Sequence, residues 1–340
     1  MRPTSRHAST SSACAASSTA RSACCASKAT EVVIPAGRIA RVRVPATSAN
    51  LGSGFDCMGL ALDWYDELEA EATGGGLVFE LSGEGAEQVP RDERHLVLAS
   101  LVDGLADLGD NVVGLVLRAH NTIPHSRGLG SSAAATVAGL ALAWGLARPD
   151  RRLDLGWVDR LSSQAEGHPD NATAAVHGGA VLAWMPDDVD AAPAVEVVEL
   201  TPVSGLRAIA LVPTFEVLTS GARKVLPDDV PRLDAVRQAT RSALLVHALT
   251  TDPARLLEAT NDLLHQPYRA GMMRPSADLV AALRAVGVPA VISGAGPTVL
   301  ALGTPDQLAL AEAVPQDGFV AHPVALGRGV ELLEARGSEG

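Results

Sequence analysis

The chain has 340 residues, of which 47% are hydrophobic and 3% aromatic, so it can bury a large core made mainly of Ala, Val and Leu. Its 27 basic residues are outnumbered by 39 acidic ones, and the net charge of −12 argues against a nucleic-acid-binding protein, which needs a basic face. No apolar run reaches the roughly 18 residues that a membrane-spanning helix requires, so we do not expect a membrane protein.

The cysteines do not form a recognisable framework. The chain has four, and their spacing is not that of a metal site: Cys14, Cys24, Cys25 and Cys57. A single core cysteine in a chain of this length argues against structural disulfides. We therefore expect a reducing compartment, the cytoplasm.

Residues 1–36 differ in composition from the rest of the chain. They consist mainly of Ser, Ala and Thr, and the four basic residues that precede Glu31 have no acidic partner among them. Such a segment cannot bury enough apolar surface to offset the entropy of ordering, so we predict a disordered, low-complexity extension. An organelle transit peptide has a similar composition and is the alternative.

The first ordered element is predicted at residues 38–46, where Val42 and Val44 alternate with arginines in the period of a half-buried strand. The apolar patterns that follow predict strands at 60–73, 77–81, 113–121 and 178–185, and helices at 94–108, 130–148 and 155–167. The helix at 130–148 is apolar nearly all round, which is typical of a buried helix.

A stretch rich in Asp, Pro and Ala at 186–202 predicts a seam between two α/β or α+β domains, at 37–195 and 203–334. After the seam, the patterns predict strands at 206–212, 290–294 and 298–302, and helices at 232–249, 253–264, 276–287 and 305–314.

Four polar motifs interrupt this apolar chain. The first, PATSANLGSGFDCMG at 45–59, places small polar side chains and glycines directly after a strand, where they can bury almost nothing. The fourth, ISGAGPTVLA at 292–301, puts a glycine-rich loop between two apolar runs, which lets the backbone approach a ligand closely. A plain β-turn is the alternative for this fourth motif.

The second motif, PHSRGLGSSAAAT at 124–136, predicts an anion site. Gly128 and Gly130 let the backbone turn tightly, and Ser131 and Ser132 open a helix. The first N–H groups and the positive dipole end of that helix attract phosphate, and a serine there can reach a metal ion that bridges phosphates. The motif is not a Walker loop, because no Lys follows the glycines. An ordinary N-cap after a glycine turn is the alternative.

The third motif, EGHPDNAT at 166–173, brings two carboxylates, an imidazole and an amide into six residues at the end of a helix. A metal ligand, a hydroxyl-orienting group and a substrate contact could all be drawn from this set. A solvated loop that caps the next helix is the alternative.

In this order, the four motifs resemble those of the GHMP small-molecule kinases, a superfamily that includes galactokinase, homoserine kinase and mevalonate kinase. PATSANLGSGFD resembles the form found in the homoserine kinase branch, and GLGSSAAA, EGHPDN and SGAGPTVLAL match the same branch. The resemblance extends over about residues 39–328. It implies an α+β fold with an amino-terminal α/β domain that contains a left-handed βαβ crossover, a carboxy-terminal ferredoxin-like domain, and an ATP cleft between them.

The resemblance implies a kinase that uses ATP and Mg²⁺ to phosphorylate the side-chain hydroxyl of L-homoserine in threonine biosynthesis. Ser132 and Glu166 are the implied metal ligands. Several relatives have the magnesium-binding glutamate eight residues before the histidine, but that position is Arg160 here, and Glu166 is the nearest glutamate. Relatives often have Asn-Leu-Val by the adenine pocket, where this chain has residues 95–97, beginning with His95. The implied ATP-binding residues are Pro124, Ser126, Arg127, Gly128, Leu129, Gly130, Ser131, Ser132, Ala133 and Ala134.

The resemblance also implies which residues bind the substrate. Asp56 would contact the ammonium group of homoserine, and two arginines, Arg223 and Arg269, would contact its carboxylate. Asn171 and Arg223 are the implied catalytic residues, although an amide cannot accept a proton at neutral pH, so positioning would matter more than a base. The full substrate set is Asn50, Asp56, His168, Asp170, Thr219, Arg223 and Arg269.

Two alternatives stay open at this point. One is another kinase of the superfamily, acting on a mevalonate-type or sugar alcohol, and the other is a non-catalytic relative that only binds ligand. Members of the superfamily often form homodimers, which makes a homodimer an option for this chain.

Overall fold

The computed structural model of the protein describes residues 32–186, 195–215 and 221–337. Most of the expected N-terminal extension, residues 1–31, therefore lies outside the described residues. The expected boundary at residue 36 is too late, because β1 (Val32–Val33) pairs in parallel with β5 (Asp110–Asn111). Ile34 follows β1 and is buried in the core, with 3% of its surface exposed, so this apolar triplet belongs to the fold.

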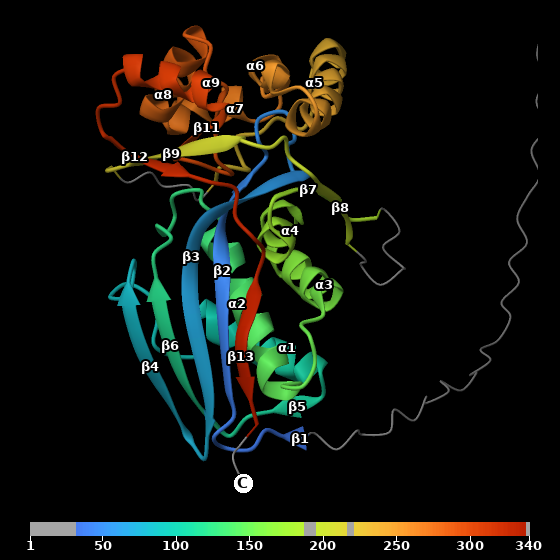
Figure 1. Ribbon diagram of the computed structural model, residues 1–340, viewed down its shortest axis with the longest axis vertical. Coiled ribbons are helices and arrows are strands. Elements are labelled where there is room, and N and C mark those ends of the chain that lie inside the picture. The colour runs from blue at the N-terminus through green and yellow to red at the C-terminus, as the bar shows by residue number, and fades with distance from the viewer. Residues whose placement is uncertain (1–31, 187–194, 216–220, 338–340) are drawn as a thin grey trace, which may run out of the picture. The chain divides into compact units, whose positions relative to one another are not determined.

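The first sheet has seven strands. Five of them lie side by side in the order β13-β2-β3-β6-β4, and β7 and β8 continue from the end of β3 (Figure 1). Their bounds are β2 (Ile39–Ala49), β3 (Met58–Thr73), β4 (Gly76–Gly83), β6 (Gly114–Asn121), β7 (Ala180–Trp184), β8 (Glu196–Leu200) and β13 (Glu331–Arg336). Only β4 and β6 are parallel, and the chain crosses between them through α1 (Leu96–Asp107), the place of the expected crossover.

Two strands of this sheet lie outside the predicted first domain. β8 falls within the predicted seam, yet it pairs with β7. The second domain was expected to extend to residue 334, which includes most of β13, yet this strand pairs antiparallel with β2. Val330, just before β13, is buried in the core of the first sheet, and this burial explains why the end of the chain returns there.

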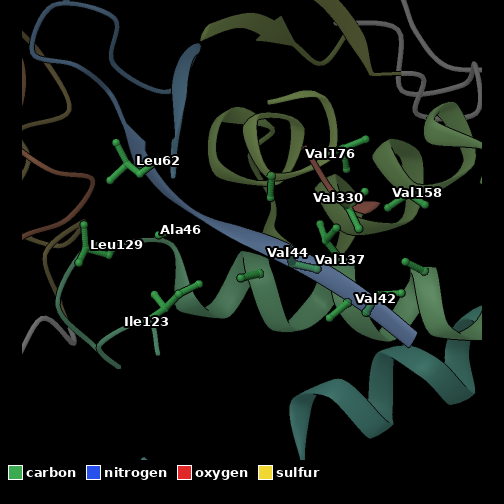
Figure 2. Packing of buried hydrophobic residues seen from close by; sticks show 14 of the residues in the cluster. Val42, Val44, Ala46, Leu62, Ile123, Leu129, Val137, Val158, Val176 and Val330 are labelled. Carbon is green, nitrogen blue, oxygen red and sulfur yellow. The ribbon is translucent and has the colours of Figure 1, made fainter. Parts of the chain in front are cut away.

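The helices α2 (Ser131–Ala147), α3 (Leu155–Glu166) and α4 (Asp170–His177) lie with α1 on one face of the first sheet (Figure 1). The prediction that α2 is buried is confirmed, because its small side chains let α1 and β2 pack closely against it. Figure 2 shows Val42 and Val44 of β2 beside Val137 of α2 in this core. The N-terminus of α2 is thereby held rigidly at one end of the sheet.

The second sheet has the antiparallel order β10-β11-β9-β12. Together with the helices after β9 and β11, this order is the split βαβ pattern of a ferredoxin-like domain, as expected. The strands are β9 (Arg207–Pro213), β10 (Ala290–Ile292), β11 (Val299–Gly303) and β12 (Phe319–Val324). The helices are α5 (Arg232–Thr250), η1 (Pro253–Arg255), α6 (Leu256–Ala259), α7 (Gln266–Arg269), η2 (Ala270–Met272), α8 (Arg274–Ala285), α9 (Pro305–Ala309) and η3 (Leu310–Ala313).

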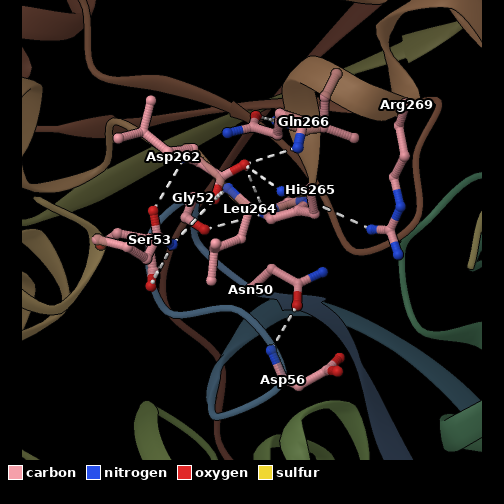
Figure 3. Close-up of polar contacts among 12 residues, drawn as sticks. Asn50, Gly52, Ser53, Asp56, Asp262, Leu264, His265, Gln266 and Arg269 are labelled. Carbon is pink, nitrogen blue, oxygen red and sulfur yellow. Dashed lines mark hydrogen bonds and ion pairs between the residues drawn. The ribbon is translucent and has the colours of Figure 1, made fainter. Parts of the chain in front are cut away.

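The helix predicted at 253–264 ends early, at Ala259. Beyond it, the carboxylate of Asp262 accepts hydrogen bonds from the backbone N–H groups of Leu264, His265 and Gln266 (Figure 3). Such local bonds compete with helical ones and turn the chain into a loop. This loop lies directly against the first motif, because a Cβ on Gly52 would come within 2.0 Å of the Thr260 carbonyl oxygen. No helix in the described part of the chain is long and apolar enough to cross a membrane.

Candidate active site

A cavity of about 530 Å³ gathers residues from all four polar motifs. One side comes from the first sheet and its helices, and the other from the loops of the ferredoxin-like domain. Its lining residues are Asn50, Asp56, Ser126, Gly128, Gly130, Ser131, Ser132, Ala133, Glu166, His168, Asp170, Asn171, Gly221, Ala222, Arg223, Lys224, Arg269, Gly294, Ala295 and Gly296. The expected cleft between the two domains is therefore present.

The N-terminus of α2 opens into this cavity. Gly130 precedes the helix with φ 67°, and no side chain of the described residues caps the first N–H groups. A side chain at Gly130 would also collide with Thr47, because its Cβ would lie 1.9 Å from the threonine Oγ1. Glycine is thus required by both conformation and space, and the uncapped N–H groups remain free for an anion.

The predicted ATP-binding residues divide into several groups. Ser126, Gly128, Gly130, Ser131, Ser132 and Ala133 line the main cavity. Leu129 is fully buried, so only its backbone is near the site. Pro124 and Arg127 line neither the main cavity nor the one beside it, and the Arg127 carbonyl accepts a hydrogen bond from Thr298 N–H.

A second cavity of about 220 Å³ adjoins the first and shares Ser126, Ser131 and Ser132 with it. Ala134 and His95 line this second cavity. Burial lowers the pKa of His95, with a smaller effect from His125. A neutral imidazole in a small, partly apolar space suits a flat uncharged ring, and His95 stands where relatives often have the asparagine of an Asn-Leu-Val segment by the adenine pocket.

Ser132 and Glu166 meet across the cavity. The serine hydroxyl donates a hydrogen bond of 2.8 Å to Glu166 Oε1. Arg160, which stands at the usual glutamate position, instead donates a hydrogen bond to Asp107 and does not line the cavity. A hydroxyl and a carboxylate at a phosphate-attracting helix end are hard oxygen donors of the kind that Mg²⁺ takes, so this pair fits the ion.

The third motif forms a connected polar chain at the start of α4. His168 Nδ1 lies 2.6 Å from Asp170 Oδ1, and the Asn171 N–H donates to the same oxygen. The hydrogen bond to Asp170 raises the pKa of His168. The Asn171 side chain accepts a hydrogen bond of 2.9 Å from the Thr47 hydroxyl, which orients its amide toward the cavity wall that α2 begins. The sequence analysis assigned no role to Thr47.

Asn50 ties the first motif to the fourth. Its side-chain amide donates to the Gly294 carbonyl at 3.0 Å, and its Oδ1 accepts from the Asp56 N–H at 2.9 Å. Asn50 and Asp56 both have positive φ, 70° and 57°, and Figure 3 shows the tight loop between them. The side-chain amide of Asn50 therefore holds the loop that presents Asp56, in addition to lining the cavity.

The residues expected to contact the ammonium and carboxylate groups of the substrate bind each other here. Arg223 donates two hydrogen bonds to Asp56, at 3.1 and 2.9 Å. Arg269 is 3% exposed and donates to the Ala222 carbonyl at 3.0 Å, so it supports the loop that carries Arg223. Burial, and then the nearby Arg223, lower the pKa of Arg269. Thr219, the remaining predicted substrate residue, lies outside the described residues.

Comparison with known proteins agrees with this geometry. Two family models match: GHMP kinases N terminal domain at residues 96–179 and GHMP kinases C terminal at residues 244–319. The homoserine kinase of Cutibacterium acnes is 53% identical over 296 residues, which are 86% of this chain and 98% of that protein. The chain belongs to the homoserine kinase family.

Other members of the homoserine kinase family extend the match. The homoserine kinase of Mycolicibacterium vanbaalenii is 48% identical, over 87% of this chain and 96% of its own. The crystal structure of homoserine kinase from Cytophaga hutchinsonii superposes with a TM-score of 0.74 at 26% identity, covering 87% of this chain and 97% of that one. Mevalonate diphosphate decarboxylase from Staphylococcus aureus, at 17% identity and a TM-score of 0.64, shares the fold alone.

The sequence analysis of this homoserine kinase family member gave no role to two polar side chains, one that supports the cavity from behind Asn171 and one that lines it. Thr47 lies within the first motif and is fully buried, so its contact with Asn171 could not be read from the sequence. Lys224 follows Arg223 directly, and its signal was only its rarity, since the chain has just two lysines.

Proposed function

We propose that the chain is an ATP:L-homoserine O-phosphotransferase that forms O-phospho-L-homoserine, a step of threonine biosynthesis. The observation that carries the proposal is that one cavity holds both an uncapped helix N-terminus and a carboxylate–guanidinium pair. The first suits the phosphates of ATP, and the second suits an amino acid that carries an ammonium and a carboxylate.

In the proposed reaction, the side-chain oxygen of homoserine bonds to the terminal phosphorus of ATP as the bond from that phosphorus to ADP breaks. The hydroxyl proton passes to a phosphate oxygen, and ADP leaves. The N–H groups at the start of α2 hold the phosphates, and Asp56 and Arg223 orient the amino acid. Asn171, fixed by Thr47, would hold the hydroxyl without removing its proton, since this transfer needs positioning more than a base.

We propose Mg²⁺ as the cofactor, held by Ser132 and Glu166 together with the phosphates of ATP. When bound, the ion would neutralise the charge that develops on the transferred phosphoryl group. The Ser132 hydroxyl oxygen and Glu166 Oε1 already lie 2.8 Å from each other, joined by a hydrogen bond. Two protein ligands are enough, because Mg²⁺ usually keeps phosphate and water oxygens as its other ligands.

We further propose the cytoplasm as the compartment, because a biosynthetic kinase needs the cytoplasmic supply of ATP and of its amino-acid substrate. A homodimer is proposed because members of the superfamily often form one. Light scattering on the purified protein will measure the oligomeric state.

A substrate panel tests the proposed function. ADP release is measured with ATP, Mg²⁺ and each of L-homoserine, mevalonate and galactose. We expect release only with L-homoserine, because the other two carry no ammonium group to pair with Asp56. Turnover of mevalonate or galactose in preference to L-homoserine would support another superfamily kinase. ATP binding without any turnover would support a non-catalytic relative.

A further inference from the structure

Lysine is rare in this chain. Of its 27 basic residues, 25 are arginines and two are lysines, Lys28 and Lys224. In the part of the chain that the structure describes, Lys224 is the one lysine, and it lines the main cavity. A chain that uses arginine almost everywhere else thus has an ammonium group at the site where phosphate chemistry is proposed.

Lys224 stands at the end of a tight turn. Its N–H donates a hydrogen bond of 2.8 Å to the Gly221 carbonyl, and the turn presents Arg223 and Lys224 to the cavity together. Among the described residues, the Lys224 ammonium has no hydrogen bond or ion pair. Its charge is therefore available to a ligand.

The cavity is also lined by two arginines, and both already have partners. Arg223 makes both of its hydrogen bonds to Asp56, and Arg269 is buried and donates to the Ala222 carbonyl. The anionic lining groups are engaged as well, with Glu166 bound to Ser132 and Asp170 next to His168. A bound nucleoside triphosphate brings several negative charges, and Lys224 is the cation left to meet them.

The phosphate-binding motif itself lacks such a cation. In a Walker loop, a lysine that follows the glycines reaches the terminal phosphates, whereas GLGSSAAA has none. Lys224 enters the cavity from the ferredoxin-like domain, beside Arg223 and Asp56. The phosphate nearest to this pair is the one next to the amino-acid acceptor, which is the terminal one.

We propose that Lys224 is a further catalytic residue, whose ammonium binds the terminal phosphoryl group of ATP as that group passes to the acceptor hydroxyl. The ammonium donates hydrogen bonds and gives up no proton, so the balance of the reaction is unchanged. This inference rests on the proposed function in one respect, which is that the acceptor is the homoserine hydroxyl. A compact ammonium suits one phosphoryl group that moves, because it does not need the fixed two-pronged geometry of arginine.

Nucleotide affinity gives the first test. Lys224→Met should weaken ATP binding by about ten- to a hundredfold, the loss expected for one charge-assisted hydrogen bond, and leave ADP binding within about twofold. Lys224→Arg keeps the charge and should restore most of the ATP affinity. Calorimetry with ATP and with ADP, in the presence of Mg²⁺ and without homoserine, measures both values. Equal losses for ATP and ADP, or no loss for either, would overturn the proposal.

A matched control comes from the same domain. Arg232 is exposed at the start of α5, has no side-chain partner among the described residues and does not line the cavity. Arg232→Met also removes one positive charge, so it should leave the ATP-to-ADP affinity ratio unchanged. Because homoserine is absent from this assay, failure of the kinase reaction and failure of the Lys224 assignment give different results.

A second test needs no substitution. An amine-reactive acetylating reagent is applied to the wild-type chain, and the rate at which the Lys224 peptide is modified is followed by mass spectrometry. ATP should slow this modification by at least about tenfold relative to ADP at saturating concentrations. Equal rates with ATP and ADP would contradict a contact with the terminal phosphate, whatever the variant proteins do.

Discussion

Arg223 and Asp56 form a two-pronged ion pair across the cavity, with hydrogen bonds of 3.1 and 2.9 Å between residues of different domains. Each is the residue assigned to one charged end of the amino-acid substrate. Under the proposed function, the ammonium and carboxylate of homoserine would take the place of this internal pair. Binding of homoserine in the proposed way would therefore replace one ion pair by two.

The first prediction concerns this pair. Both partners are partly exposed, with 55% of the Arg223 and 35% of the Asp56 side-chain surface accessible, so the pair adds at most about 1 kcal/mol to stability. Arg223→Ala should nonetheless lower kcat/KM for homoserine by about ten- to a hundredfold. Steady-state kinetics and thermal unfolding measure the two effects, with Arg274→Ala as an exposed control on α8.

The same variant should also lose its preference for a carboxylate. Wild-type protein should strongly favour homoserine over 3-aminopropan-1-ol, which lacks that group, and Arg223→Ala should discriminate far less. An unchanged preference in the variant would mean that Arg223 does not contact the carboxylate.

The second prediction separates Arg269 from Arg223. Arg269 is buried and bonded to the Ala222 carbonyl, so Arg269→Ala leaves a buried acceptor without its donor. It should destabilise the fold by about 1–3 kcal/mol, unlike Arg223→Ala. Urea denaturation measures both free energies of unfolding. Equal stability of the two variants would show that the buried contact is not structural.

The third prediction concerns the proposed metal pair. Ser132→Ala and Glu166→Gln should each raise the Mg²⁺ concentration needed for half-maximal activity by about 10- to 100-fold. Ser131→Ala should be milder, because the hydrogen bond to Glu166 comes from Ser132. Activity is measured against Mg²⁺ at saturating ATP. If Ser131→Ala and Ser132→Ala behave alike, the assignment of Ser132 is wrong.

The fourth prediction is that Thr47 positions Asn171. Thr47→Val removes the donor of the 2.9 Å hydrogen bond to the Asn171 carbonyl oxygen but keeps the shape of the side chain. It should lower kcat while changing KM little, because the amide would no longer be held. Thr173→Val is the control, since Thr173 is buried, belongs to α4 as Asn171 does and, among the described residues, its hydroxyl bonds only to the Pro169 carbonyl. A loss of kcat in both variants would indicate a general disturbance of α4.

The fifth prediction is a pH dependence of stability from His168. The hydrogen bond to Asp170 raises the pKa of His168, and the charges of Asp170 and Asp56 add to this effect, while burial and the charge of Arg223 oppose it. A raised pKa stabilises the fold fully below the unfolded value of about 6.5. This stabilisation is lost as the pH rises through the folded pKa. His168→Gln should therefore destabilise the protein more at pH 5.5 than at pH 8.5, as measured by urea denaturation, and a constant difference would contradict the assignment.

The sequence predicted the elements whose pattern is strong. The buried helix α2 and the strands β2 and β3 follow from long runs with a clear period. Five short strands were missed: β1 and β5 have only two residues each, and the apolar residues of β8, β12 and β13 do not alternate regularly. The break after Ala259 was missed too, since it depends on the three backbone bonds that Asp262 accepts.

The site was predictable as a set of residues but not as a set of contacts. The motifs contain Asp56, Ser132 and Glu166, and the family resemblance added Arg223; all four line the cavity. That Arg223 pairs with Asp56, 167 residues away, depends on how the two domains meet, and no local pattern carries this information. Asn50 illustrates the same limit, because its amide holds the loop of Asp56 as well as lining the cavity.

Phosphorus NMR of the product tests the central claim most directly. After incubation with ATP, Mg²⁺ and L-homoserine, the account predicts a phosphomonoester signal coupled to the two protons of the terminal methylene group, with one ester formed for each ADP. Release of inorganic phosphate in place of this ester would contradict it, because transfer to water would mean that the cavity does not hold the homoserine hydroxyl as the acceptor.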